Sequence, residues 1–179
     1  MIEPGPWRTL STKSVYKNPW LEVTERDVAL PDGRTIFYGV VRTGECAGVL
    51  PFVDHDTVLL VRQWRYIIER ATWEIPTGGC HAGESFEAAA HREMREETGY
   101  RAGRLVSIGA YNTSKSVVDE TAHLYLGYDL EPDDTAQPDD TEMISIERIP
   151  FDQALAWVLD GEIVDGMSII AILRAARLR

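Results

Sequence analysis

The residues best suited to chemistry in this 179-residue chain lie in one run, residues 78–100, with the sequence GGCHAGESFEAAAHREMREETGY. Glu93 and Glu97 are four positions apart, so on a helix they share one face, with roughly 5–6 Å between Cβ atoms. The same run also contains Glu84, Arg92 and Glu96. Clustered carboxylates repel one another unless a cation lies among them, and oxygen ligands of this kind suit Mg²⁺ or Mn²⁺. The run therefore predicts a site for a divalent cation, which commonly accompanies phosphate-bearing substrates.

The spacing of these residues resembles the Nudix box of nucleoside-diphosphate-X hydrolases. Five residues separate Gly78 from Glu84, seven separate Glu84 from Arg92, and the box then ends in REMREETGY. The charged and glycine positions of the family pattern are all filled, and Tyr100 alone departs from it, because the family usually has an aliphatic residue there. A solvated amphipathic helix is the plainer explanation of a charge run. It does not explain why the flanking glycines and the arginine also fall in register.

The resemblance implies roles for the residues of the box. The implied metal ligands are the backbone carbonyl of Thr77 and the carboxylates of Glu93, Glu97, Glu96 and Glu84. Glu96 is either a third ligand or a support for the main pair, and Glu84 would orient a ligand or a metal-bound water. We interpret Arg92 as an ion-pair partner that holds the acids in place, because an arginine on this face gains nothing from burial unless it is paired.

A general base is also needed, because a carboxylate that holds a metal is poorly available for proton transfer. In the ADP-ribose subgroup of the family, a loop after the helix supplies it, usually with Ser-Pro-Gly ahead of an acid. The matching segment here is residues 112–120, NTSKSVVDE, which lacks the Pro-Gly. Glu120 is the first candidate for the base, ahead of Asp119 and Glu96, and Lys115 could contact a phosphate or a sugar-linked acid. The plainer alternative is that Glu120 is an exposed loop acid.

The residues before the box narrow the substrate that the resemblance implies. The stretches LLVRQWRY (59–66) and WEIPTG (73–78) look like those of ADP-ribose pyrophosphatases and their nucleotide-sugar relatives. Arg65 and Glu74 are charged positions in apolar surroundings, so they either pair with each other or face the substrate, and we favour the substrate. Trp20 could stack on a base, although aromatic residues in a hairpin more often serve packing.

The elements that must position these residues follow from the apolar pattern. Strands are expected near residues 20–30, 35–42, 47–53, 57–62, 73–76, 104–111, 122–128 and 143–149, and helices at 151–159 and 168–178. The central helix of the box should begin after Ser85 and end at Gly99. This order resembles the α/β/α sandwich of the Nudix fold with a mixed sheet, residues 44–179, plus an N-terminal β-hairpin extension, residues 1–43.

The hairpin extension bears on the assembly. In the subgroup that the sequence resembles, the hairpin is exchanged across a dimer and helps to build the nucleoside pocket of the partner subunit. A homodimer is therefore expected. The alternative is a structural extension that packs on its own domain, since peripheral elements vary within a fold.

Composition bounds the remaining function classes. The net charge of −11 argues against binding to a nucleic-acid backbone, so an anionic substrate must be drawn by a local patch. Much of the excess acid lies in Glu131–Glu142, which reads as an exposed loop more than as a second metal site. No long apolar stretch or leader is evident, so we expect no membrane insertion and a cytoplasmic protein.

The cysteines and nearby histidines carry little further signal. Cys46 and Cys80 are the only cysteines, and both are expected to be reduced thiols. The spacing of Cys80, His81 and His91 matches no zinc pattern. A cysteine nucleophile is equally unsupported, because no paired base accompanies it.

The sequence thus predicts a Mg²⁺-dependent pyrophosphatase, with Mn²⁺ as the alternative ion. Its substrate would be ADP-ribose or a related nucleoside diphosphate sugar, cleaved to a nucleoside monophosphate and a sugar phosphate. Another Nudix substrate stays open, such as GDP-mannose, a dinucleoside polyphosphate or a damaged nucleotide. A non-catalytic sensor of nucleotide sugars also stays open, although the intact Glu93, Glu96 and Glu97 argue against it.

Overall fold

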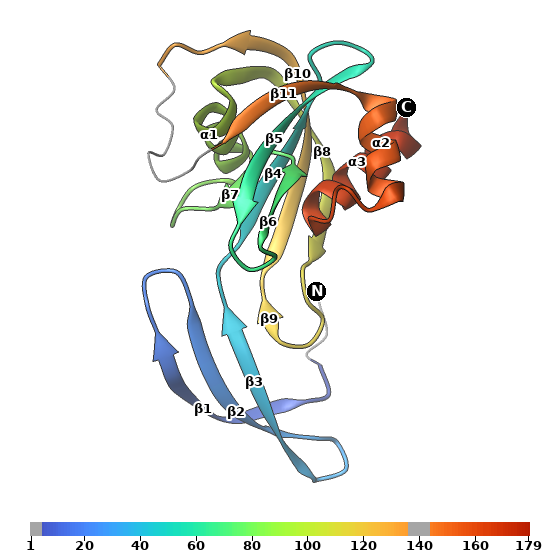
Figure 1. The fold of residues 1–179 in the computed structure, drawn as a ribbon. Helices are drawn as coiled ribbons and strands as arrows, with labels where there is room; N and C mark the ends of the chain where they lie inside the picture. Colours follow the sequence, from blue (N-terminus) through green and yellow to red (C-terminus); the bar gives the residue numbers. More distant parts are fainter. Residues whose placement is uncertain (1–4, 136–143) are drawn as a thin grey trace. The chain divides into compact units, whose positions relative to one another are not determined.

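The computed structural model describes residues 5–135 and 144–179 and divides them into two compact units (Figure 1). Unit 1 contains the N-terminal part of the chain up to Gly44 together with Asn112–Thr121. Unit 2 contains Glu45–Tyr111 and Ala122–Arg179. The sequence predicted a separate N-terminal extension, but it did not predict that a later segment would join it.

Unit 1 is a four-stranded sheet in the order β1-β2-β3-β9. Its strands are β1 (Arg8–Lys17), β2 (Glu22–Ala29), β3 (Thr35–Arg42) and β9 (Val118–Asp119). The first three strands pair antiparallel, and β9 pairs parallel with β3. The predicted hairpin corresponds to β2 and β3. Strand β1 was missed because all of its residues are exposed, so no buried face produces the alternation that marks a strand.

Unit 2 contains two sheets, in the orders β7-β4-β10-β8 and β11-β5-β6. Their strands are β4 (Cys46–Pro51), β5 (Thr57–Arg65), β6 (Arg70–Glu74), β7 (Thr77–Gly79), β8 (Tyr100–Asn112), β10 (Thr121–Pro132) and β11 (Ser145–Pro150). The helices are α1 (Phe86–Thr98), α2 (Phe151–Asp160) and α3 (Gly166–Leu178). Strand β4 runs parallel to β10 and antiparallel to β7, so the sheet is mixed as predicted.

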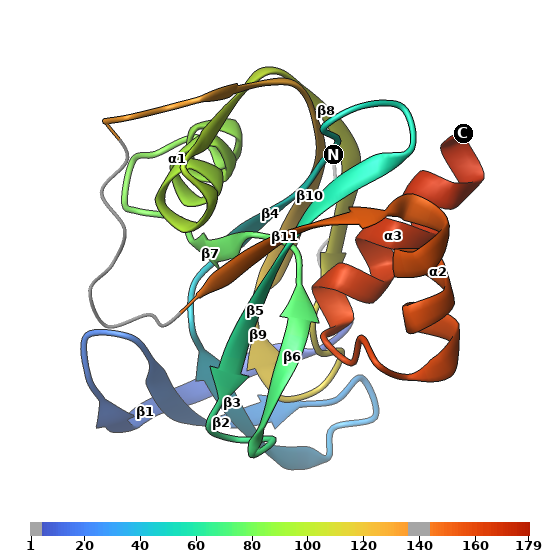
Figure 2. The ribbon, with the colours of Figure 1, turned by 45° about the horizontal axis from the view of Figure 1, so that its top comes forward.

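Successive residues of β4 face opposite sides of the sheet, and each side is covered by helix. Ala47 and Val49 are buried in a cluster with Met94 of α1. Leu50 is buried in the larger cluster, which includes Ile172 of α3. Figure 2 shows α1 on one side of these strands and α2 and α3 on the other. This is the α/β/α layering that the sequence predicted.

The boundaries of the helices follow local rules. The Ser85 side chain caps α1 by accepting a hydrogen bond from the Ala88 N–H, and Gly99 ends α1 with φ of 68°. Both predictions are confirmed. Helix α3 begins two residues earlier than predicted, because Asp165 caps it by accepting from the Ser168 N–H. Strand β11 starts at Ser145, and Met143 of the predicted strand lies outside the described residues.

Other sequence expectations meet the structure only in part. In the described ranges, no helix is both long enough and apolar enough to cross a membrane. Both cysteines are free thiols, and burial raises the pKa of Cys80. Of the acidic run at 131–142, residues 136–142 lie outside the described residues, while Glu131 pairs with Arg101.

Candidate metal and substrate site

The centre of the candidate site is Arg92, on the first half of α1. Its Nε and Nη2 each lie 3.0 Å from one oxygen of Glu84, so the guanidinium and carboxylate pair through two parallel hydrogen bonds. Its Nη1 donates to Glu93 at 2.6 Å and to Glu96 at 3.1 Å. Nη2 also donates to the Gly79 carbonyl at 2.8 Å. One side chain thereby ties three acids of the box to β7.

These contacts set the electrostatics of the cluster. Hydrogen bonds from Arg92, followed by one from the His81 backbone N–H, lower the pKa of Glu84 to about 2. The same pairing, with Glu84 first and Glu93 and Glu96 next, raises the pKa of Arg92 against the effect of its burial. Side chains of Arg92, Glu84 and Glu93 are less than a fifth exposed. Glu84 and Arg92 therefore keep their charges at neutral pH.

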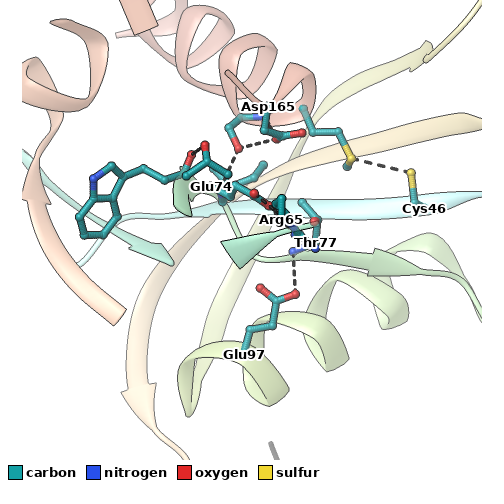
Figure 3. A network of polar contacts seen from close by, with 11 residues as sticks. Cys46, Arg65, Glu74, Thr77, Glu97 and Asp165 are labelled. Atoms are coloured by element: carbon teal, nitrogen blue, oxygen red, sulfur yellow. Dashed lines mark hydrogen bonds and ion pairs between the residues drawn. The ribbon is translucent and has the colours of Figure 1, made fainter. Parts of the chain in front are cut away.

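Strand β7 passes close to the acids of α1. A Cβ atom built on Gly78 would lie 2.1 Å from Cδ of Glu93, so glycine lets that carboxylate lie where it does and a larger residue would displace it. The neighbouring Thr77 N–H donates to Oε1 of Glu97 at 3.3 Å, a contact drawn in Figure 3. Glu93 and Glu97 of α1 thus both lie beside β7, the strand that carries Thr77.

The donor set suits a hard divalent cation. Carboxylate oxygens and a backbone carbonyl are the ligands that Mg²⁺ and Mn²⁺ prefer, and the side-chain-free cradle at Gly78 admits Glu93 against the strand. As the side chains stand, no group of three or more His, Cys, Asp or Glu residues within 5–135 and 144–179 is disposed to hold a metal ion. Three of the acids are engaged by Arg92 instead.

A hollow of about 310 Å³ in unit 2 reaches the same strand. It is lined by Arg65, Ile68, Thr72, Glu74, Thr77, Val164, Asp165 and Gly166. Arg65 donates from Nε to both oxygens of Glu74, at 2.9 and 3.1 Å, and Glu74 is 4% exposed. The pairing that the sequence left open is therefore present, and both residues also border the hollow next to Thr77.

Asp165 is a residue of this hollow that the sequence reasoning missed. Its Oδ2 accepts from both the backbone N–H and the hydroxyl of Ser168, at 2.8 and 2.6 Å. Ser168 in turn accepts from the Ile75 N–H at 2.9 Å and is fully buried. The signal was available, since an Asp three residues before a Ser at the start of an apolar run is a helix-cap pattern.

The remaining predicted residues belong to unit 1. Glu120 accepts a hydrogen bond from the Thr43 hydroxyl at 2.8 Å. Asp119 accepts two from Arg42, each at 3.1 Å, so its Oδ2 is occupied by an ion pair. The Trp20 side chain is 78% exposed. The structure neither tests nor changes the roles predicted for these residues.

Lys115 borders a hollow of about 520 Å³ within unit 1. The lining comes from β2, β3 and the 112–119 segment and comprises Arg26, Tyr38, Val40, Asn112, Ser114, Lys115, Ser116, Val117, Val118 and Asp119. Two cationic side chains and one aromatic ring meet there. Trp20 is not among the lining residues, so the structure does not join it to Lys115.

A hollow of about 570 Å³ in unit 2 is lined by other residues, which include Phe52, Arg104, Tyr128 and Arg179. The Arg104 guanidinium lies 4.3 Å from the centre of the Tyr128 ring, and Arg104 also faces Asp129. Arg179 pairs with Asp56 at 2.6 Å. Each arginine already has a carboxylate partner. This hollow is therefore a weaker candidate site for an anionic ligand than its two arginines alone would indicate.

Two family models match the chain in succession. A model described as the nucleoside diphosphate sugar hydrolase N-terminal domain matches residues 7–41. A model described as the NUDIX domain matches residues 42–166.

Individual relatives match nearly the whole chain. An ADP-ribose pyrophosphatase of Bacillus subtilis is 30% identical over 166 residues, covering 92% of this chain and 90% of the relative. A GDP-mannose pyrophosphatase of Klebsiella pneumoniae is 31% identical, covering 88% and 82%. The crystal structure of an ADP compounds hydrolase superposes with a TM-score of 0.87, over 99% of this chain and 96% of that one, at 21% identity. That last likeness confirms the predicted fold.

The close approach of β7 to α1 can be tested by substitutions at Gly78 and Gly79. Gly78→Ala should push the Glu93 carboxylate out of its hydrogen bond with Arg92 and cost about 1 kcal/mol of unfolding free energy, because the carboxylate is the flexible end of its side chain and can move. Gly79→Ala is the matched control, because a Cβ there meets nothing within 4 Å. Urea denaturation of both variants checks this. Equal losses in the two variants would contradict the packing argument.

Proposed function

The chain belongs to the Nudix family of pyrophosphohydrolases, and we propose that it hydrolyses the diphosphate bond of ADP-ribose or a related nucleoside diphosphate sugar. The products would be a nucleoside monophosphate and a sugar phosphate. The observation that carries this proposal is the array of acids around Arg92, set against the backbone of β7. The N-terminal domain match at residues 7–41 supports the nucleotide-sugar class.

The acids of α1 and the Thr77 carbonyl would hold one or more Mg²⁺ ions, with Mn²⁺ as an alternative. A bound ion would neutralise the charge of the leaving phosphate and lower the pKa of the attacking water. Arg92 would keep Glu84, Glu93 and Glu96 close together before any ion arrives. Because the carboxylates are already ordered, metal binding would not have to supply the free energy needed to order them.

Proton transfer would fall to Glu120, with Asp119 as the second candidate. Glu120 is held by a neutral hydroxyl, that of Thr43, whereas Asp119 is paired with the Arg42 guanidinium. The Arg42 guanidinium thus occupies Oδ2 of Asp119 with two hydrogen bonds, whereas the hydrogen bond to Glu120 comes from a hydroxyl that can turn away. This difference supports Glu120 as the base.

Each unit has a hollow whose lining suits groups of such a substrate. The hollow at Thr77 has the Arg65–Glu74 pair and Asp165 on its walls, which suits hydroxyl-rich groups next to the diphosphate because carboxylates accept hydrogen bonds from hydroxyls. The hollow in unit 1 has Arg26, Lys115 and Tyr38, and a cation beside an aromatic ring suits a phosphate or a base.

GDP-mannose is the second candidate substrate, because the Klebsiella pneumoniae relative carries the name GDP-mannose pyrophosphatase at 31% identity. A non-catalytic sensor is a third reading. To separate them, the protein is incubated with ADP-ribose, ADP-glucose, GDP-mannose and a dinucleoside polyphosphate in the presence of Mg²⁺ or Mn²⁺. Phosphate is then measured after a phosphatase is added. Highest kcat/KM on an ADP-sugar supports the proposal, and binding without turnover on every compound supports the sensor.

Glu97→Gln should lower kcat at least about 100-fold. The amide oxygen still accepts from Thr77, but the charge that would hold a divalent ion is lost. Glu87→Gln is the matched control, since Glu87 is an exposed acid on the same helix and its loss should leave the rate nearly unchanged. Rates within a few-fold of each other in the two variants would refute the metal-ligand role.

Glu120→Gln should lower kcat about 10²–10⁴-fold, because the base is gone. Asp119→Asn should change kcat only slightly. Steady-state kinetics from pH 5 to 9 on both variants test the assignment. A large loss in Asp119→Asn with a small one in Glu120→Gln would transfer the role to Asp119.

We also propose that the protein is a homodimer formed through unit 1. Strand β1 is exposed along its whole length, and Trp20 and Phe37 are 78% and 63% exposed. Exposed apolar side chains of this size support an interaction surface on unit 1.

Sedimentation equilibrium should give a mass about twice the 20.1 kDa of one chain. Phe37→Glu should shift the protein toward the monomer, because it places a charge in the apolar contact. Leu159→Glu is the control, since Leu159 is a 73% exposed apolar residue of unit 2. A monomeric wild-type protein at micromolar concentration would refute the proposal.

A further inference from the structure

The short link between β6 and β7 has unusual backbone partners. The Ile75 N–H donates to the Ser168 hydroxyl oxygen, and Pro76 has no N–H to offer. The Thr77 N–H donates to the Glu97 carboxylate. The backbone donors of this link are thus taken by two side chains, one from α3 and one from α1. Figure 3 shows Asp165 of the α3 side and Glu97 of the α1 side flanking the strand that carries Thr77.

Ser168 is well suited to hold this link in a single orientation. It is fully buried, so water cannot replace its partners. Its hydroxyl hydrogen is committed to Asp165 at 2.6 Å, which turns the oxygen lone pairs toward the Ile75 N–H at 2.9 Å. Asp165 is itself fixed, because it also accepts from the Ser168 N–H at the start of α3.

Packing joins the same two elements a second time. A Cβ atom on Gly48 of β4 would lie 2.9 Å from a methyl group of Thr77, 3.0 Å from Cε of Met167 and 3.1 Å from Cδ1 of Ile75. The start of α3 and the β6–β7 link therefore meet over one glycine. Because the three side chains border the same glycine, we expect a shift of α3 to disturb the packing beside Thr77.

We propose that Ser168, with Asp165 as its acceptor, is a positioning residue for the diphosphate hydrolysis. It acts through the Ile75 backbone to hold Thr77 against Glu97, and it touches no substrate itself. The inference rests on the proposed function for its kinetic consequence. The structural step, from Ser168 to the Thr77–Glu97 contact, stands without substrate or metal.

The test uses Ser168→Ala, which leaves the Ile75 N–H without its acceptor. In the metal-free protein, NMR-detected hydrogen exchange of the Thr77 amide should become at least about tenfold faster. With Mg²⁺ and the best diphosphate of the panel, kcat should fall about 10–100-fold, while KM stays within about threefold. Misplacement of a reacting group acts on the chemical step more than on binding.

Ala175→Gly is the matched control. It weakens the same helix, two turns beyond Ser168, by an amount typical of glycine in a helix interior. It should lower the melting temperature while leaving Thr77 exchange and kcat close to wild type. Equal effects of Ala175→Gly and Ser168→Ala on Thr77 exchange would overturn the inference, because a general loss of helix stability would then suffice.

A second pair of variants keeps the inference testable if Ser168→Ala does not fold. Ser168→Thr keeps the hydroxyl and should retain most of the Thr77 protection. Asp165→Asn keeps an acceptor but removes its charge, and should loosen Thr77 to a smaller degree in the substrate-free protein. Slow Thr77 exchange in Asp165→Asn with fast exchange in Ser168→Thr would contradict the proposed role. If wild type cleaves no diphosphate, the exchange data still decide the structural step, so the two failures are distinguishable.

Discussion

The main physical constraint on the site is the electrostatic repulsion among several carboxylates that lie close together and are partly shielded from water. Arg92 offsets this repulsion with a planar guanidinium that forms ion pairs with Glu84, Glu93 and Glu96 at once. A lysine could not do the same, because its ammonium is a single point of charge without the fixed fork. Nη2 of Arg92 also donates to the Gly79 carbonyl. The residue that compensates the charge of the acids therefore also holds α1 against β7.

The next requirement is a strand that approaches the acids without a side chain in the way. Gly78 meets it, and the residues just before Gly78 carry the strand into place. In that short stretch the Pro76 carbonyl accepts from the Val49 N–H, whereas the N–H groups of Ile75 and Thr77 donate to side chains. It relies on Ser168 from one helix and Glu97 from another. Residues far apart in the sequence therefore share control of one backbone position.

The local features of the site were predictable and the tertiary ones were not. Helix α1 could be bounded from Ser85 and Gly99 because capping is read within a few residues. The choice between pairing and substrate contact for Arg65 and Glu74 could not be made, since Glu74 lies opposite Val61 in the β5–β6 register and only the folded hairpin brings the arginine back to it.

The same distinction explains the elements that were missed. Strand β1 lacks a buried face, so its sequence gives no periodic signal. It becomes a strand only because β2 offers an edge to pair with. The segment that joins unit 1 late in the chain was likewise invisible, as its contact with β3 spans more than seventy positions of sequence.

That late segment has a consequence for how the protein can be rearranged by recombination. Unit 1 is discontinuous in sequence, because β9 and the Val117 carbonyl, which come much later in the chain, pair with the edge of β3. A chimaera that exchanged only the first forty-four residues with a homologue would combine β3 of one protein with β9 of another. Grafts between relatives must therefore move Asn112–Thr121 together with the amino-terminal strands as one inherited module.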